Sequence, residues 1–175
     1  MRNVEIKARV GDLSTLFDRA KAIADSGPVE ILQDDTFFAC ERGRLKLREF
    51  HAEAGELIFY RRPDSSAPKV SEYLIAKTPE PSKLREALAQ AYGVVGRVRK
   101  RRQLFLVKNT RIHLDEVEGL GTFMELEVVL GADDTSEEGQ AIAGDLMSHL
   151  GIARDDLIET AYVDLLNSKN QQECR

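Results

Sequence analysis

Residues 3–10 read Asn3-Val4-Glu5-Ile6-Lys7-Ala8-Arg9-Val10, and polar and apolar side chains alternate along this stretch without interruption. The polar and charged residues hold the odd positions, and the aliphatic residues hold the even positions. A period of two residues is typical of a β-strand, because successive side chains point to opposite faces. The stretch therefore predicts an opening strand with one apolar face and one charged face.

Three further segments put charges on one face and apolar side chains on the other. They are 42–48 with Arg42, Arg44, Lys46 and Arg48, 111–115 with Arg111, His113 and Asp115, and 123–130 with Glu125 and Glu127. Periodicity alone leaves two arrangements open. An antiparallel sheet can turn its charged face to water above a core. A closed barrel can instead point its charged faces into a wet tunnel and cover its apolar outer faces with helices.

The rest of the pattern predicts an α+β chain, in which amphipathic helices precede, interrupt and follow a long series of strands. Strands dominate residues 31–130, including a short one at 36–38 and a hairpin formed by 98–107 and 110–117. Helices are predicted over 13–23 after an Asp12 N-cap, around 84–91 before Gly93, and after the capping-box pair Thr135 and Glu138. One or two helical turns at 162–166 are expected to precede a polar, frayed tail over 167–175.

Length and composition restrict the class of protein. A chain of 175 residues fits one domain, and 25 Lys and Arg against 30 Asp and Glu give a formal net charge of −5. This balance argues against a protein whose whole surface binds nucleic acid. No stretch approaches the roughly 20 apolar residues of a membrane span. Cys40 and Cys174 are too few for a disulfide framework, and residues 1–7 contain no apolar signal core. We therefore expect a cytoplasmic protein whose partners are neither nucleic acid nor membrane.

Clustered bases accompany clustered carboxylates in this sequence. Four cations share one face of 42–48 with no acid of the same parity, and 97–102 forms a second basic block. Like charges in such a row repel each other unless an anion lies among them. Carboxylates such as Glu125 and Glu127 can hold a hard cation, while Lys and Arg neutralise phosphate oxygens. The pattern therefore suits a metal-bound polyphosphate.

Four segments, taken in order, resemble one known family. Asn3-x-Glu5-x-Lys7 resembles the ExExK signature of the CYTH superfamily, the triphosphate tunnel metalloenzymes. This group includes class IV adenylyl cyclases, thiamine triphosphatases and inorganic triphosphatases. The segments 44–48, 110–127 and 161–166 are similar to the family's central basic strand, late acidic hairpin and closing motif. The resemblance runs from residue 2 to about residue 166.

The resemblance implies a closed eight-stranded antiparallel β-barrel around a charged tunnel, with amphipathic helices packed outside. This CYTH-like domain would cover 1–166, and 167–175 would be a polar tail. As metal ligands for Mg²⁺ or Mn²⁺ the resemblance implies Glu5, Asp115, Glu125 and Glu127. As phosphate-binding residues it implies Lys7, Arg44, Lys46, Arg48, Lys69, Lys100, Arg102 and Arg111. It gives catalytic roles to Glu5, Lys7 and Asp115, implies a nucleoside triphosphate or polyphosphate as partner, and allows a homodimer.

Within the family, the Gly-Leu-Gly-x-Phe stretch at 119–123 looks most like the class IV cyclase branch, which converts ATP to cyclic AMP and pyrophosphate. Three alternatives stay open: a triphosphatase that hydrolyses the terminal phosphate, a non-catalytic nucleotide or polyphosphate binder, and an RNA-contacting barrel that uses 97–102. Asn3 stands where the motif has its first acid, so a metal site here carries one negative charge fewer. His113 shares the parity of Asp115, and it is either a phosphate contact or a packing residue.

Overall fold

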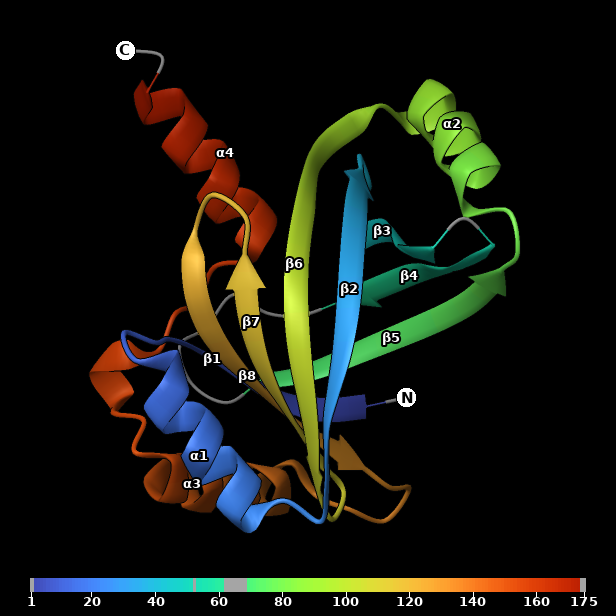
Figure 1. The fold of residues 1–175 in the computed structure, drawn as a ribbon. Coiled ribbons are helices and arrows are strands. Elements are labelled where there is room, and N and C mark those ends of the chain that lie inside the picture. The colour runs from blue at the N-terminus through green and yellow to red at the C-terminus, as the bar shows by residue number, and fades with distance from the viewer. Residues whose placement is uncertain (1, 52, 62–68, 174–175) are drawn as a thin grey trace.

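A computed structural model describes residues 2–51, 53–61 and 69–173, and in it the strands form a closed antiparallel ring (Figure 1). The strands are β1 (Arg2–Arg9), β2 (Ser26–Phe38), β3 (Arg44–His51), β4 (Ala54–Arg61), β5 (Lys69–Thr78), β6 (Val94–Val107), β7 (Thr110–Val117) and β8 (Gly121–Leu130). The helices are α1 (Leu13–Ile23), α2 (Pro81–Tyr92), α3 (Ser136–Leu150), a short 3-10 helix (Arg154–Asp156) and α4 (Tyr162–Glu173). The predicted α+β fold with a closed eight-stranded sheet is confirmed.

The opening strand β1 closes the ring, because it pairs with β5 on one side and β8 on the other. The strand order is β1-β5-β4-β3-β2-β6-β7-β8, so β2 and β6 lie side by side although a long stretch of chain separates them. The register of β1 with β8 sets Glu5 opposite Glu127 and Lys7 opposite Glu125. Charged side chains from distant parts of the sequence therefore meet on the inner face of the ring.

The apolar faces of the strands point outward, where α1 and α3 cover them (Figure 1). Ile6, Phe105, Ile112 and Leu126 are almost fully buried in this outer core, and Leu146 of α3 packs with them. Both helices begin as predicted. The Asp12 carboxylate accepts a hydrogen bond from the Thr15 amide at 3.0 Å, and Thr135 and Glu138 form a complete capping box. Because the helices cover these apolar faces, the opposite, charged faces of β1, β7 and β8 point to the interior of the ring.

Two elements are much longer than predicted. The short strand expected at 36–38 is the end of the 13-residue β2, which pairs with β6 along nearly its whole length. Its first residues are mostly exposed and include Pro28, so they lack the apolar alternation that marks a strand. The tail expected after residue 166 continues α4 to Glu173. Its side chains are polar and exposed, and Asn167 and Lys169 tie the helix to backbone carbonyls of Val95 and Gly119.

The start of α4 packs against one end of the ring. Tyr162 and Val163 are buried against Phe37, Val98 and Phe123 in a second apolar cluster. The helix then runs outward from the ring (Figure 1). None of the helices in the described part of the chain is long and apolar enough to cross a membrane.

Candidate functional site

The charged strand faces meet inside the ring around a cavity of about 330 Å³. Side chains from all eight strands and from the start of α4 line it. Among the described residues the lining carries six bases (Lys7, Lys46, Arg48, Lys100, Arg102 and Arg111) and five acids (Glu5, Asp35, Glu56, Glu125 and Glu127). Of the two arrangements that periodicity left open, the structure therefore has the inward-facing one. A cavity lined by both signs of charge can accept a cation and an oxyanion together.

The basic block 97–102 is divided by the alternation of β6. Lys100 and Arg102 point inward and are buried, whereas Arg97, Arg99 and Arg101 are exposed on the outer face. The outer arginines pair with acids of neighbouring strands and turns, for example Arg97 with the Asp34 carboxylate at 2.6 Å. Two of the five bases in the block therefore contribute to the cavity.

Glu125 of β8 is the centre of an inner network. Its carboxylate lies 3.0 Å from the Lys7 ammonium and 2.5 Å from the Arg102 guanidinium. Burial raises the pKa of the Glu125 carboxyl, but Lys7, Lys100 and Arg102 more than offset this and hold it well below its usual range. The carboxylate is therefore charged at neutral pH and offers strong acceptor oxygens.

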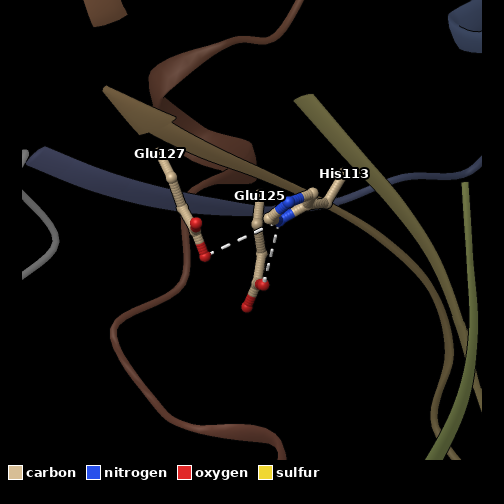
Figure 2. A group of neighbouring side chains, drawn as sticks. All are labelled: His113, Glu125 and Glu127. Atoms are coloured by element: carbon tan, nitrogen blue, oxygen red, sulfur yellow. Dashed lines mark ion pairs between the residues drawn. The ribbon is translucent and has the colours of Figure 1, made fainter. Parts of the chain in front are cut away.

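Glu125, Glu127 and His113 converge at the wall formed by β7 and β8 (Figure 2). His113 Nδ1 lies 3.7 Å from Glu127 Oε1 and 3.9 Å from Glu125 Oε2. One ligand atom of each residue lies within 4.8 Å of the others. Burial, reinforced by Arg102, lowers the pKa of the His113 imidazole to about 4, so that the ring is neutral at pH 7. The group has the donor types and spacing of a metal site.

Glu5 and Asn3 line the same cavity from β1. Glu5 lies directly opposite Glu127 in the register of β1 with β8, and like charges in such a position favour an intervening cation. Asn3 is 2% exposed, and its Oδ1 has no hydrogen-bond partner among the described residues. Three predicted metal ligands, Glu5, Glu125 and Glu127, therefore share one cavity, and the residues present fit a divalent ion.

Asp115, predicted as a metal ligand and catalytic residue, shares the inward parity of His113 but is bound by side chains of β6 and α4. It is fully buried, is absent from the cavity lining, and accepts hydrogen bonds from Arg102 at 2.7 and 2.6 Å, Lys100 at 3.1 Å and the Tyr162 hydroxyl at 3.1 Å. Burial raises the pKa of its carboxyl, but Arg102 and Lys100 more than offset this and hold it well below the usual range. Asp115 therefore orients two phosphate-binding candidates, and its carboxylate does not reach the cavity that would hold a metal.

Asp35 of β2 is a site residue that the sequence reasoning missed. Its carboxylate lies 2.7 Å from the Lys46 ammonium and 2.8 Å from the Arg48 guanidinium, and the residue is 2% exposed. Burial raises the pKa of the Asp35 carboxyl, but Arg48 and Lys46 more than offset this and hold it far below its usual range. The acid that separates the like charges of β3 therefore comes from the neighbouring strand.

Two of the residues predicted to bind phosphate are not among the cavity-lining residues that the structure describes. The Arg44 guanidinium forms a bidentate pair with Asp164 of α4 at 3.2 and 2.6 Å and is absent from the cavity lining. The backbone of Lys69 pairs with Glu5 in the ring, but its side chain lies outside what the structure describes. Lys7, Lys46, Arg48, Lys100, Arg102 and Arg111 do face the cavity.

Tyr162 holds the inner cations in place, a role that its closing motif alone did not reveal. The Lys7 ammonium lies 3.8 Å from the centre of its ring and the Lys100 ammonium 5.1 Å, within the range of cation–π attraction. Its hydroxyl donates to Asp115 at 3.1 Å. Tyr162 therefore positions two cations at the end of the cavity that α4 closes.

The CYTH domain family matches residues 1–162 of this chain. The chain belongs to the CYTH family. This CYTH chain is 24% identical over 176 residues to a Methanocaldococcus jannaschii protein named "putative adenylate cyclase", covering 94% of this chain and 98% of that protein.

Solved structures share the CYTH chain's fold. A Pyrococcus horikoshii protein matches with a TM-score of 0.84 at 23% identity, over 93% of this chain and 98% of that one. A Vibrio parahaemolyticus protein described as a "putative adenylate cyclase" matches with a TM-score of 0.77 at 18% identity, over 94% and 97% of the two chains. At these identities the likeness establishes the fold, and the chemistry must be argued from the site.

Proposed function

We propose that this CYTH protein is a divalent-metal-dependent enzyme that acts on a triphosphate inside the ring, with ATP converted to cyclic AMP and pyrophosphate. One observation carries the proposal: six bases and five acids line a single cavity of about 330 Å³. Membership of the CYTH family and the adenylate cyclase names of its relatives agree with this assignment. The proposal assigns distinct tasks to the two signs of charge.

The bases bind and orient the phosphates. Arg48 and Arg102 present guanidinium groups, which suit bidentate contacts with phosphate oxygens, and Lys46 and Lys100 add point charges from the adjoining strands. At about 4 Å and an effective dielectric near 20, each such contact contributes on the order of 4 kcal/mol before desolvation. Several contacts together neutralise the charge that builds up as a phosphoryl bond breaks.

The acids supply the metal side of the site. Glu5, Glu125 and Glu127 would hold the ion, and their shared cavity with the bases is what a metal-bound phosphate requires. When bound, the divalent ion would neutralise phosphate oxygens and assist the departure of the leaving group. Asp115 stays outside this set and keeps Lys100 and Arg102 aligned for the phosphates.

An apolar part of the lining favours an organic triphosphate over an inorganic one. Ile31, Phe37, Ile58, Tyr60 and Ile75 come from β2, β4 and β5 and face the same cavity as the charges. Phosphate oxygens gain nothing from apolar carbon, whereas a nucleobase buries its flat face against aliphatic and aromatic side chains. This arrangement supports ATP, in which the 3′-hydroxyl of the ribose attacks the α-phosphorus and pyrophosphate leaves.

A product analysis tests the proposed reaction. Purified protein is incubated with ATP, tripolyphosphate or thiamine triphosphate, each with Mg²⁺ or Mn²⁺, and the products are separated by chromatography. We expect cyclic AMP and pyrophosphate from ATP. Orthophosphate from any of the three would instead identify a triphosphatase, and tight binding without any product would identify a non-catalytic binder.

Binding of the triphosphate is expected to weaken as the pH rises through about 8. Burial, reinforced by Arg48, lowers the pKa of the Lys46 ammonium to about 8, so the free protein loses this positive charge above that pH. Lys46→Arg keeps the charge, because a guanidinium titrates only above about pH 12. Titration calorimetry with tripolyphosphate across this range should show the alkaline loss in the wild type and its displacement to higher pH in Lys46→Arg. Identical profiles for the two proteins would remove Lys46 from the phosphate site.

A further inference from the structure

His113 is a buried polar residue for which the binding of phosphates gives no role. It is 4% exposed, and its Nδ1 has no hydrogen-bond partner in the described part of the chain. A buried polar atom without a partner carries a desolvation cost of about 1–3 kcal/mol. The described part of the chain therefore does not supply the partner that this nitrogen needs.

The geometry around His113 excludes a direct hydrogen bond and suits a shared ion. The separations of 3.7 and 3.9 Å from Nδ1 to the Glu127 and Glu125 oxygens are too long for a hydrogen bond. Two ligand atoms that each lie about 2.1 Å from one ion are roughly 3–3.5 Å apart. Side-chain adjustments of less than about an ångström would bring the nitrogen and both oxygens onto one ion. Figure 2 shows the imidazole and both carboxylates turned toward the same space.

We propose that His113, Glu125 and Glu127 form a nitrogen-containing site for a late first-row transition ion such as Zn²⁺, in preference to Mg²⁺. The inference rests on the proposed function, since it names the ion class of the same site. Imidazole suits Zn²⁺ and its neighbours, whereas Mg²⁺ keeps oxygen ligands and several waters. A nitrogen ligand from the chain therefore shifts the selectivity of the site away from Mg²⁺.

The surrounding bases already contact both carboxylates of this site, so an ion would replace part of these contacts. Lys7 and Arg102 hold Glu125, and Arg111 lies 3.3 Å from Glu127. These cations are also candidates for the phosphates, so a bound triphosphate would draw them from the carboxylates and strengthen ion binding. The buried His113 nitrogen pairs with none of them, and it is the donor that distinguishes this site from an all-oxygen one.

Nuclear magnetic resonance of protein labelled with ¹⁵N-histidine tests the ligation directly. The chain has three histidines, and His51 and His149 are exposed internal controls. Zn²⁺ added to the whole protein should move a His113 ring-nitrogen resonance, leave those of His51 and His149 in place, and be displaced only by a large excess of Mg²⁺. A His113 resonance that stays unchanged at saturating Zn²⁺ would overturn the proposal.

Affinity measurements give a second test. His113→Gln should weaken Zn²⁺ binding by about 100-fold or more and should alter Mg²⁺ binding little. Mutation of a residue that only hydrogen-bonds to a metal ligand already weakens metal binding by roughly 10–100-fold. His149→Gln is the matched control and should bind both ions as the wild type does. Equal loss of Zn²⁺ and Mg²⁺ in His113→Gln, or no loss of Zn²⁺, would contradict the proposal. If His113→Gln fails to fold, the resonance experiment on the wild type decides alone.

The two proposals fail in different ways. Unchanged His113 resonances together with turnover of a triphosphate in Mg²⁺ would reject the nitrogen ligand and keep the proposed function. A Zn²⁺-shifted His113 resonance without binding or turnover of any triphosphate would reject the proposed function and keep the metal site.

Discussion

Replacing Glu125 with Gln is expected to reduce turnover of the triphosphate by about 100- to 1,000-fold, the cost of removing one charge-stabilising group from an active site. The side chain of Glu125 contacts Lys7 and Arg102 and lies in the cluster with His113 and Glu127. An amide of the same shape removes the negative charge that an ion requires. Steady-state rates of product formation, with Mg²⁺ or Mn²⁺ in excess, measure the effect.

The matched control for Glu125→Gln is a substitution on the outer face of the ring. Glu116→Gln removes an acid of β7 whose side chain is 50% exposed and whose carboxylate lies 3.9 Å from Arg101. This variant should keep the wild-type rate. Circular dichroism of both variants separates lost chemistry from lost fold. Full activity of a folded Glu125→Gln protein would place the metal site elsewhere.

Asp35→Asn should lower the free energy of unfolding by about 3–5 kcal/mol, the usual cost of breaking a buried ion pair by removing one partner. Asp35 is the carboxylate between Lys46 and Arg48, and all three are largely buried. Without it, two like charges face each other inside the ring with no anion between them. Urea denaturation followed by circular dichroism measures the change.

Asp34→Asn is the control for Asp35→Asn, since the neighbouring side chain points to the outer face. Asp34 pairs with Arg97 across side chains that are 26% and 42% exposed. Exposed pairs contribute about 0–1 kcal/mol, so a small loss is expected. Equal destabilisation by the two substitutions would show that the buried position of Asp35 is unimportant. If tripolyphosphate restores part of the free energy of unfolding that Asp35→Asn loses, this would agree with phosphates binding between Lys46 and Arg48.

The alternation of β1 and β8 made the charged face of each strand predictable from sequence. A period of two residues is local, so Glu5 and Lys7 could be assigned to one face of β1, and Glu125 and Glu127 to one face of β8, before any strand was paired. Closure of the ring was implied only by the family resemblance, because pairing of β1 with both β5 and β8 is a long-range property.

The structure departs from the sequence-based expectations at residues whose contacts come from other strands or helices. Asp115 has the right parity for the cavity, but its position opposite Arg102 in the pairing of β6 with β7 occupies its carboxylate. Asp35 was missed because β2 begins with exposed residues that carry no strand pattern. Arg44 was assigned to phosphate although Asp164 of α4 binds it. Periodicity predicts the face of the strand on which a side chain lies, but not which residue of another strand or helix contacts it.

A crystal structure with a non-hydrolysable ATP analogue and Mn²⁺ would test the central claim most directly. The account predicts the triphosphate inside the ring, with its oxygens at Lys46, Arg48 and Arg102, and anomalous density for manganese beside Glu125 and Glu127. A triphosphate bound on the outer surface, with these five side chains still in their present ion pairs, would contradict it.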